Sequence, residues 1–167
     1  MVRTVNVPRN VDVNTNLAIV VLPKASLVDP LLPSATELQA AQDVTYSHTT
    51  DGLNATSTQE TITDPRLSLE NVPESPGNVT NSLEVTYFYG DEELALDPLL
   101  VKDAELYVVV RDTVDVTEDF AAAQKVDVYS ITVGAPRKNR ETNGKQTKTT
   151  KLFVQQKWVD VAVSAAA

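Results

Sequence analysis

The chain lacks several of the residues on which enzyme and metal sites depend. None of its 167 residues is cysteine, and His48 is the only histidine. Disulfides and thiolate metal sites are therefore excluded, and one imidazole cannot form a histidine metal cluster. The sequence has only five glycines, and it contains neither a Gly-x-Gly-x-x-Gly nor a Walker phosphate loop. From these absences we expect no catalytic site, no metal and no cofactor.

Long apolar runs are also absent. The longest, residues 17–22, has six residues, whereas a membrane-spanning helix needs about 20. The first ten residues include two arginines but no apolar segment follows them, so a signal peptide is not indicated. We therefore expect no membrane association, and synthesis in a cytoplasm.

Aromatic residues are scarce, at 5% of the chain, although 42% of residues are apolar. The core must then be built from Val, Leu, Ile and Ala, and the frequent β-branched residues favour sheets. A length of 167 residues fits a single domain, 1–167. Because Trp158 is the sole tryptophan, the sequence offers little with which to stack a sugar ring.

The charge is acidic overall but unevenly distributed. The net charge is −9, which argues against sequence-specific nucleic-acid binding because phosphate attraction needs a basic surface. Residues 137–157 contain seven basic residues and one acidic residue, giving +6, so the remainder carries −15. Two interpretations stay open: a solvated basic hairpin, or a protein with two unlike ends that attract each other in an assembly.

The pattern of residues predicts many short strands and one helix. Ser34 and Glu37 form a capping box ahead of good helix formers, which predicts a short helix over about 35–42. The continuous apolar run in 105–112 predicts a strand covered on both faces. Strands are expected over residues 17–22, 43–49, 58–63, 82–89, 105–112, 125–134, 147–157 and 158–163.

Polar and breaker-rich segments separate these strands. We expect an extended arm over 1–16, a turn at Asp51 and Gly52, and an irregular loop over 73–77. Residues 117–124 are ambiguous, with one helical turn as an option at 120–123. Asn143-Gly144 is a strong hairpin signal and places a basic hairpin loop over 135–147. The predicted fold is mainly β, a sandwich or barrel with one short flanking helix.

Four segments together resemble the major tail-tube proteins of siphophages that infect Actinobacteria. They occur in the expected order and together comprise 77 of the 167 residues. The segments are SATELQAAQDVTYSHTTDGLNATSTQETITDPRL (34–67), SLEVTYFYGD (82–91), DFAAAQKVDVYSITVG (119–134) and TKTTKLFVQQKWVDVAV (147–163).

This resemblance implies a structural virion protein and not an enzyme. Six copies would close into a ring, and stacked rings would form a hollow tail tube whose inner barrel takes four strands from each copy. Genomic DNA would pass through without specific binding. The implied partners are other copies, the tape measure protein in the lumen, and the tail terminator and distal tail proteins at the ends. Such tubes belong to the virion tail and are assembled in the host cytoplasm.

The uneven charge fits such a tube. An acidic lumen repels phosphate, and Glu84 and Asp127 are the candidate lumen-facing residues. Unlike ends suit a head-to-tail contact that does not close on itself, with residues 115–119 as a further possible acidic partner. The candidate inter-subunit contacts are Arg137, Lys138, Arg140 and Lys145 on the basic side, and Asp91, Glu92 and Glu93 on the acidic side.

Two other readings stay open at this point. One is a different virion β-protein, such as a capsid decoration protein or a head–tail connector component. The other is a carbohydrate-binding or adhesin domain, which the scarcity of aromatic residues disfavours.

Overall fold

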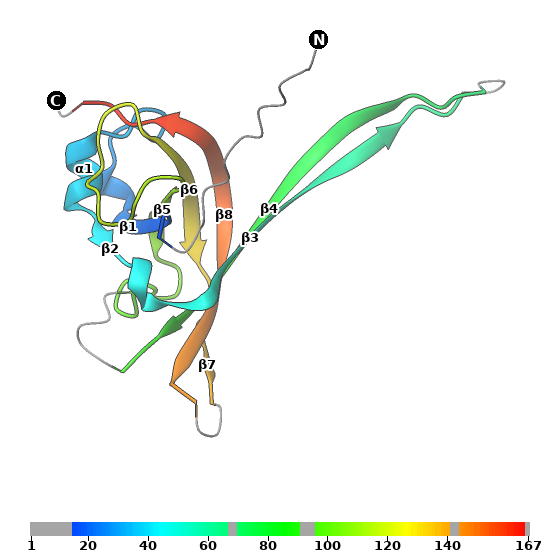
Figure 1. Ribbon diagram of the computed structural model, residues 1–167. Helices are drawn as coiled ribbons and strands as arrows, with labels where there is room; N and C mark the ends of the chain where they lie inside the picture. The colour runs from blue at the N-terminus through cyan, green and yellow to red at the C-terminus, as the bar shows by residue number, and fades with distance from the viewer. Residues whose placement is uncertain (1–14, 67–69, 91–95, 141–143, 166–167) are drawn as a thin grey trace, which may run out of the picture. The chain divides into compact units, whose positions relative to one another are not determined.

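Strands dominate the structure. The computed structural model describes residues 15–66, 70–90, 96–140 and 144–165 (Figure 1). Two 3-10 turns, η1 (Lys24–Ser26) and η2 (Thr45–Ser47), and one helix, α1 (Ala35–Ala40), accompany the strands. The strands in these ranges are β1 (Ala18–Pro23), β2 (Gln42–Asp43), β3 (His48–Thr63), β4 (Glu74–Phe88), β5 (Glu105–Arg111), β6 (Lys125–Val133), β7 (Arg137–Asn139) and β8 (Thr147–Ala162).

All eight strands belong to one sheet. Their hydrogen-bonded order is β2-β1-β5-β6-β8-β4-β3, and β7 pairs with β8 off this path. The prediction of a mainly β fold with one short helix is confirmed. No helix in the described ranges is long and apolar enough to cross a membrane.

The capping box begins α1 as the sequence predicts. The Ser34 hydroxyl accepts a hydrogen bond from the Glu37 amide at 3.2 Å, and the Glu37 carboxylate accepts one from the Ser34 amide at 2.9 Å. The bonds from Ser34 and from the Val28 amide lower the pKa of Glu37. The helix ends at Ala40, two residues before the predicted end, because Ala41 adopts an extended conformation.

By its internal contacts the chain divides into two compact units. Among the described residues, the first contains 15–45, Tyr107–Val128 and 158–165. Its core is mostly aliphatic, as the composition predicts, and Trp158 packs against it from a partly buried position. The buried members are Ala18, Val20, Leu22, Leu27, Ala35, Leu38, Tyr107, Val109, Phe120, Val126, Val128, Val161 and Val163.

Strand β5 is buried on both faces, since Leu106 through Arg111 are all buried. The prediction from its continuous apolar run is confirmed for the apolar residues. The apolar run does not predict the burial of Arg111, which is charged.

The second unit contains Tyr46–Leu106 and Tyr129–Lys157. Here β3 and β4 form a long antiparallel hairpin, visible in cyan and green in Figure 1. Strand β4 pairs with β8 only from Leu83 to Phe88. Residues 54–63 and 74–82 therefore pair only with each other, and we call this two-stranded segment the ribbon.

Several predicted boundaries in the second unit were wrong. The turn predicted at Asp51 and Gly52 is a bulge inside β3, where the register shifts between His48 and Leu53. A side chain at Gly52 would collide with the Thr86 carbonyl oxygen and the backbone of Thr49. Glycine at this position allows the backbones of these residues to lie close together, and the chain does not reverse direction here.

The continuous strand predicted over 43–49 was also wrong, because η2 separates β2, which ends at Asp43, from β3, which begins at His48. After the short β2, the Asp43 carboxylate accepts hydrogen bonds from the Thr45 amide at 2.9 Å and its hydroxyl at 2.7 Å. This local bonding favours the 3-10 turn η2 over a strand. Val44 is buried while Tyr46 is 77% exposed, so the two side chains do not share a face.

The irregular loop predicted over 73–77 was wrong as well, because β4 begins at Glu74. Pro76 is tolerated there because the ribbon has open edges, where a missing N–H need not break a ladder bond. The strands predicted over 147–157 and 158–163 form one continuous β8, with Asp160 at a positive φ of 54°. Residues 120–123 make a turn and no helical segment.

The basic hairpin loop predicted over 135–147 is partly regular, because Arg137–Asn139 form β7 and pair with β8. Asn143 lies outside the described residues, as do residues 1–14 of the predicted arm.

Candidate functional site

Among the described residues, no group of three or more His, Asp or Glu side chains could hold a metal ion. The features that stand out are instead three exposed surfaces: a basic–aromatic surface and the ribbon in the second unit, and an acidic loop in the first.

The basic–aromatic surface forms where β7 and the end of β4 meet β8. Lys138 and Lys148 lie directly opposite each other in the β7–β8 ladder, an arrangement that is normally destabilising for like charges. The Tyr89 ring offsets this, since both ammonium groups lie over it, 5.4 and 4.7 Å from its centroid. Lys148 also pairs with Asp97 at 2.5 Å. Lys145 lies over the Phe88 ring at 5.7 Å.

A hollow of about 400 Å³ opens on this surface. The side chain of Asn139 is fixed at its wall by hydrogen bonds to the hydroxyls of Thr147, at 3.3 Å, and Thr149, at 2.8 Å. The lining combines two cations, an aromatic ring and amides, a combination suited to an anionic group. The residues that line the hollow are Tyr89, Asn139, Arg140, Gly144, Lys145 and Gln146.

The structure places the four predicted basic contact residues on β7 and around this hollow. Arg137 and Lys138 lie on β7, and Arg140 and Lys145 line the hollow. None of the four forms an ion pair with another described residue. The predicted acidic contacts Asp91, Glu92 and Glu93 lie outside the described residues.

The ribbon is the feature that sequence reasoning missed. Its central parts, 54–59 and 75–82, contain no charged residue and are largely exposed. Ile62 and Val79 are 59% and 56% exposed. A two-stranded hairpin is marginally stable in water on its own, and soluble proteins usually protect open strand edges with charges. In the sequence, the long runs of Thr, Ser and Asn in these segments are the signal that could have indicated the ribbon.

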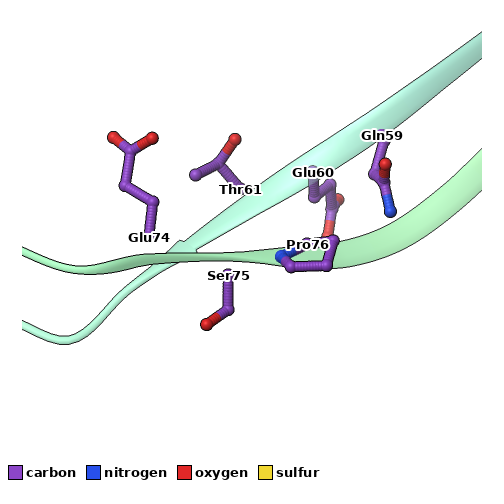
Figure 2. Close-up of a pocket in the computed structure, with 6 residues that line it drawn as sticks. All are labelled: Gln59, Glu60, Thr61, Glu74, Ser75 and Pro76. Atoms are coloured by element: carbon purple, nitrogen blue, oxygen red, sulfur yellow. The ribbon is translucent and has the colours of Figure 1, made fainter.

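A second hollow, of about 270 Å³, lies on the ribbon near a bulge. Figure 2 shows that Glu74 and Thr61 project to one side of the ribbon and Ser75 to the other. Its lining side chains therefore do not converge on a common point. This hollow does not have the arrangement of a ligand site.

The two predicted lumen residues occupy different surroundings. Glu84 is exposed on β4 and lies opposite Lys151 of β8 in the ladder. Asp127 is partly buried on β6, and its carboxylate accepts a hydrogen bond from the Asp160 amide at 2.9 Å. Desolvation of the carboxylate, followed by repulsion from Asp127 and Asp160, raises the pKa of Asp112.

Residues 112–119 form the acidic loop, which sequence reasoning considered only in part. The loop follows Arg111, whose guanidinium donates to the carbonyls of Asp115 at 2.9 Å and Glu118 at 2.8 Å. It also lies 4.5 Å from the Phe120 ring centroid. Burial lowers the pKa of Arg111, yet an arginine remains charged in a protein. A buried cation thus holds the loop in one conformation.

Comparison with known proteins identifies a family for this chain. A family model described as phage tail tube protein matches residues 4–167. The hybrid solid-state NMR and cryo-EM structure of the SPP1 tail tube is similar, with a TM-score of 0.60 at 15% identity, covering 90% of this chain and 80% of that one. The six-fold symmetrised cryo-EM baseplate of the anti-feeding prophage contains a chain with a TM-score of 0.60 at 11% identity, covering 90% of this chain and 96% of that one.

At these identities the two solved structures show a shared fold, and the family rests on the sequence model. No curated protein sequence matches the chain. Because the family match spans nearly the whole chain, this chain belongs to the phage tail tube proteins, structural and non-enzymatic components of the virion tail that self-assemble into its tube.

Proposed function

We propose that six copies of this chain close into a ring and that rings stack into a hollow tube whose acidic lumen conducts genomic DNA. The observation that carries the proposal is the ribbon. Its open edges, its uncharged central parts over 54–59 and 75–82, and its exposed Ile62 and Val79 are costly for a free subunit. They become favourable where strands and side chains of neighbouring copies cover them, because strand pairing between chains satisfies the open edges.

Six-fold closure is supported by the sequence resemblance and by the six-fold symmetry of the anti-feeding prophage baseplate. The acidic lumen is supported by the net charge of −9, since a conduit for a polyanion should repel it. Glu84 and Asp127 stay the candidate lumen residues. The tape measure, tail terminator and distal tail proteins are proposed partners, and an actinobacterial host remains a prediction of the sequence resemblance alone.

Negative-stain electron microscopy of the purified protein at increasing concentration tests this proposal. We expect hollow tubes of uniform width built from six-fold rings, because the ribbon gives each copy an unsatisfied surface. Image averaging would give the symmetry. A protein that stays monomeric at high concentration, or forms only sheets or irregular aggregates, would contradict the proposal.

The ribbon's part can be tested separately. Thr56→Lys with Thr58→Lys places two cations on its uncharged centre, which should leave the subunit folded and strongly reduce tube formation. The control is Asp51→Asn with Glu70→Gln, which also raises the charge by two. Lys substitutions at Thr113 and Thr117 would be a poorer control, because the Thr117 hydroxyl donates a hydrogen bond to Asp115. Tubes at wild-type yield from the Thr56/Thr58 variant would remove the ribbon from the assembly surface.

A further inference from the structure

The acidic loop presents a preorganised negative surface. It carries four carboxylates and no basic residue within 112–119. The carboxylate of Asp115 is used internally, since it accepts bonds from the Thr117 amide at 2.9 Å and hydroxyl at 2.6 Å. Glu118 and Asp119 are exposed, and neither side chain has a hydrogen bond or ion pair with another described residue. These two adjacent carboxylates are available to a partner.

The loop is held at both ends. Arg111 fixes the carbonyls of Asp115 and Glu118. Gln124 accepts from the Arg111 guanidinium at 3.2 Å and from the Ala121 amide at 3.1 Å. A loop that is already ordered loses little conformational entropy when it binds. The acidic loop therefore resembles a rigid ligand more than a flexible tail.

The hollow of the basic–aromatic surface presents the opposite charge. Arg140 and Lys145 line it, and Lys138 stands beside it over the Tyr89 ring. Arginine binds carboxylates through two parallel hydrogen bonds. A volume of about 400 Å³ admits one or two carboxylate side chains.

We propose that the acidic loop of one copy docks into this hollow on the next copy, with Glu118 and Asp119 facing Arg140 and Lys145. This contact rests on the proposed tube function, and it specifies which surfaces of neighbouring copies meet in the tube. Because one chain carries both the loop and the hollow, the contact joins unlike surfaces and can repeat without closing on itself.

A nucleic-acid phosphate has the same charge as these carboxylates, but the observations favour a second copy. The chain has a net charge of −9, which repels a polyanion at long range. A neighbouring copy supplies two carboxylates in a fixed loop at high local concentration. Nucleic-acid binding is therefore an outcome that the experiments must be able to reveal.

Charge exchange between the two surfaces tests the contact. Arg140→Glu with Lys145→Glu should raise the concentration needed for tube formation by about ten-fold or more, since like charges then face each other. Glu118→Lys with Asp119→Lys should do the same. The variant carrying all four substitutions should form tubes again near the wild-type concentration. Lys102→Glu with Lys125→Glu makes the same change in charge as the first pair and should assemble normally.

Each outcome decides a separate question. Tubes from both reversed variants at wild-type concentration would overturn the contact while leaving the tube function intact. Loss in both without recovery in the combined variant would also overturn it. A wild-type protein that forms no tubes would count against the proposed function and this contact together. Retention of an added DNA duplex by wild type, lost on Arg140→Glu with Lys145→Glu, would assign the hollow to phosphate instead.

Cross-linking gives a second measurement, because the chain has no cysteine of its own. Lys145→Cys with Glu118→Cys should produce, on mild oxidation of tubes, a ladder of disulfide-linked oligomers on a non-reducing gel. Lys145→Cys with Glu60→Cys, which places the second thiol on the ribbon, should give none. A ladder only from the ribbon pair, or cross-linking within single chains only, would contradict the proposed contact.

Discussion

Arg111 is the buried cation of the first unit, and the loop that follows depends on it. Its fork of donors satisfies two backbone carbonyls and the Gln124 amide oxygen. Removing the donors leaves these acceptors without their partners at a partly buried position. Lysine cannot replace the fork, because an ammonium group lacks the planar geometry.

We therefore predict that Arg111→Met lowers the free energy of unfolding of the free subunit by about 2–4 kcal/mol. Arg111→Lys should also destabilise it, by a smaller amount. Urea denaturation below the concentration of assembly measures both, and Lys125→Met, an exposed change, should stay within about 0.5 kcal/mol of wild type. A loss below about 1 kcal/mol for Arg111→Met would mean that the loop does not depend on the guanidinium.

The contribution of Asp112 to the free energy of unfolding depends on pH. Its pKa in the folded protein is raised above the ordinary 3.8 by desolvation of the carboxylate and by repulsion from Asp127 and Asp160. The folded state then binds a proton more tightly than the unfolded state, so Asp112 favours folding at low pH. That contribution is lost as the pH rises through the raised pKa, leaving a repulsive carboxylate at neutral pH.

Asp112→Asn should accordingly make the subunit more stable than wild type at pH 7, with the difference shrinking as the pH falls toward 3.8. Urea denaturation across this range measures the difference. Glu74→Gln, which removes one exposed carboxylate from the ribbon, is the control for the loss of one carboxylate. An Asp112→Asn effect independent of pH would contradict the assignment.

At the scale of elements, the ribbon should change most between the free and assembled protein. Residues 54–63 and 74–82 pair only with each other, so their amides should exchange quickly in the free subunit. In tubes, neighbouring copies should slow that exchange by at least about ten-fold if strand edges are covered. Hydrogen exchange read by mass spectrometry on both states tests this, with β5 as an internal reference that is protected in both. Equal exchange in the two states would exclude the ribbon from subunit contacts.

Elements whose local signals agree with their packing could be predicted from the sequence. The capping box located α1, and the apolar run located β5. The failures arose where tertiary context decided the outcome. Pro76 and Gly77 indicate a loop, yet an open-edged ribbon tolerates both residues within a strand. Gly52 indicates a turn, yet it serves a close backbone contact inside β3.

The candidate site was predictable in charge and not in geometry. The basic cluster at residues 137–145 is visible in the sequence, but the arrangement around Tyr89 depends on the pairing of β7 with β8. Arg111 looked like one more polar residue at the end of an apolar strand. Its burial depends on carbonyls up to seven residues away, which no pattern of residue types reveals.

At the scale of the whole molecule, the charge distribution should govern what the tube retains. Reversing the two candidate lumen residues, Glu84→Lys with Asp127→Lys, should still allow assembly but should give tubes that hold DNA. Co-sedimentation of a labelled duplex at low salt measures this, and added salt should release it. Asp51→Lys with Glu70→Lys makes the same change in charge at other exposed positions. Equal DNA retention by both variants would assign the effect to net charge and not to a lumen.

The bulge at Gly77 has a consequence for how uniform the subunits are. Gln59 lies opposite Val79, and Thr61 lies opposite Pro76. Between these two pairs β4 therefore contains one more residue than β3. A side chain at Gly77 would come within 3.0 Å of the Glu60 carbonyl oxygen, which ties the extra residue to this place. The flanking Thr, Ser and Asn residues resemble one another, and such strands can slip past each other by two residues at little cost. The bulge marks one alignment of the two strands as correct. Every copy then presents the same side chains at the same positions along the ribbon. A polymer of identical units requires its subunits to be uniform in this way.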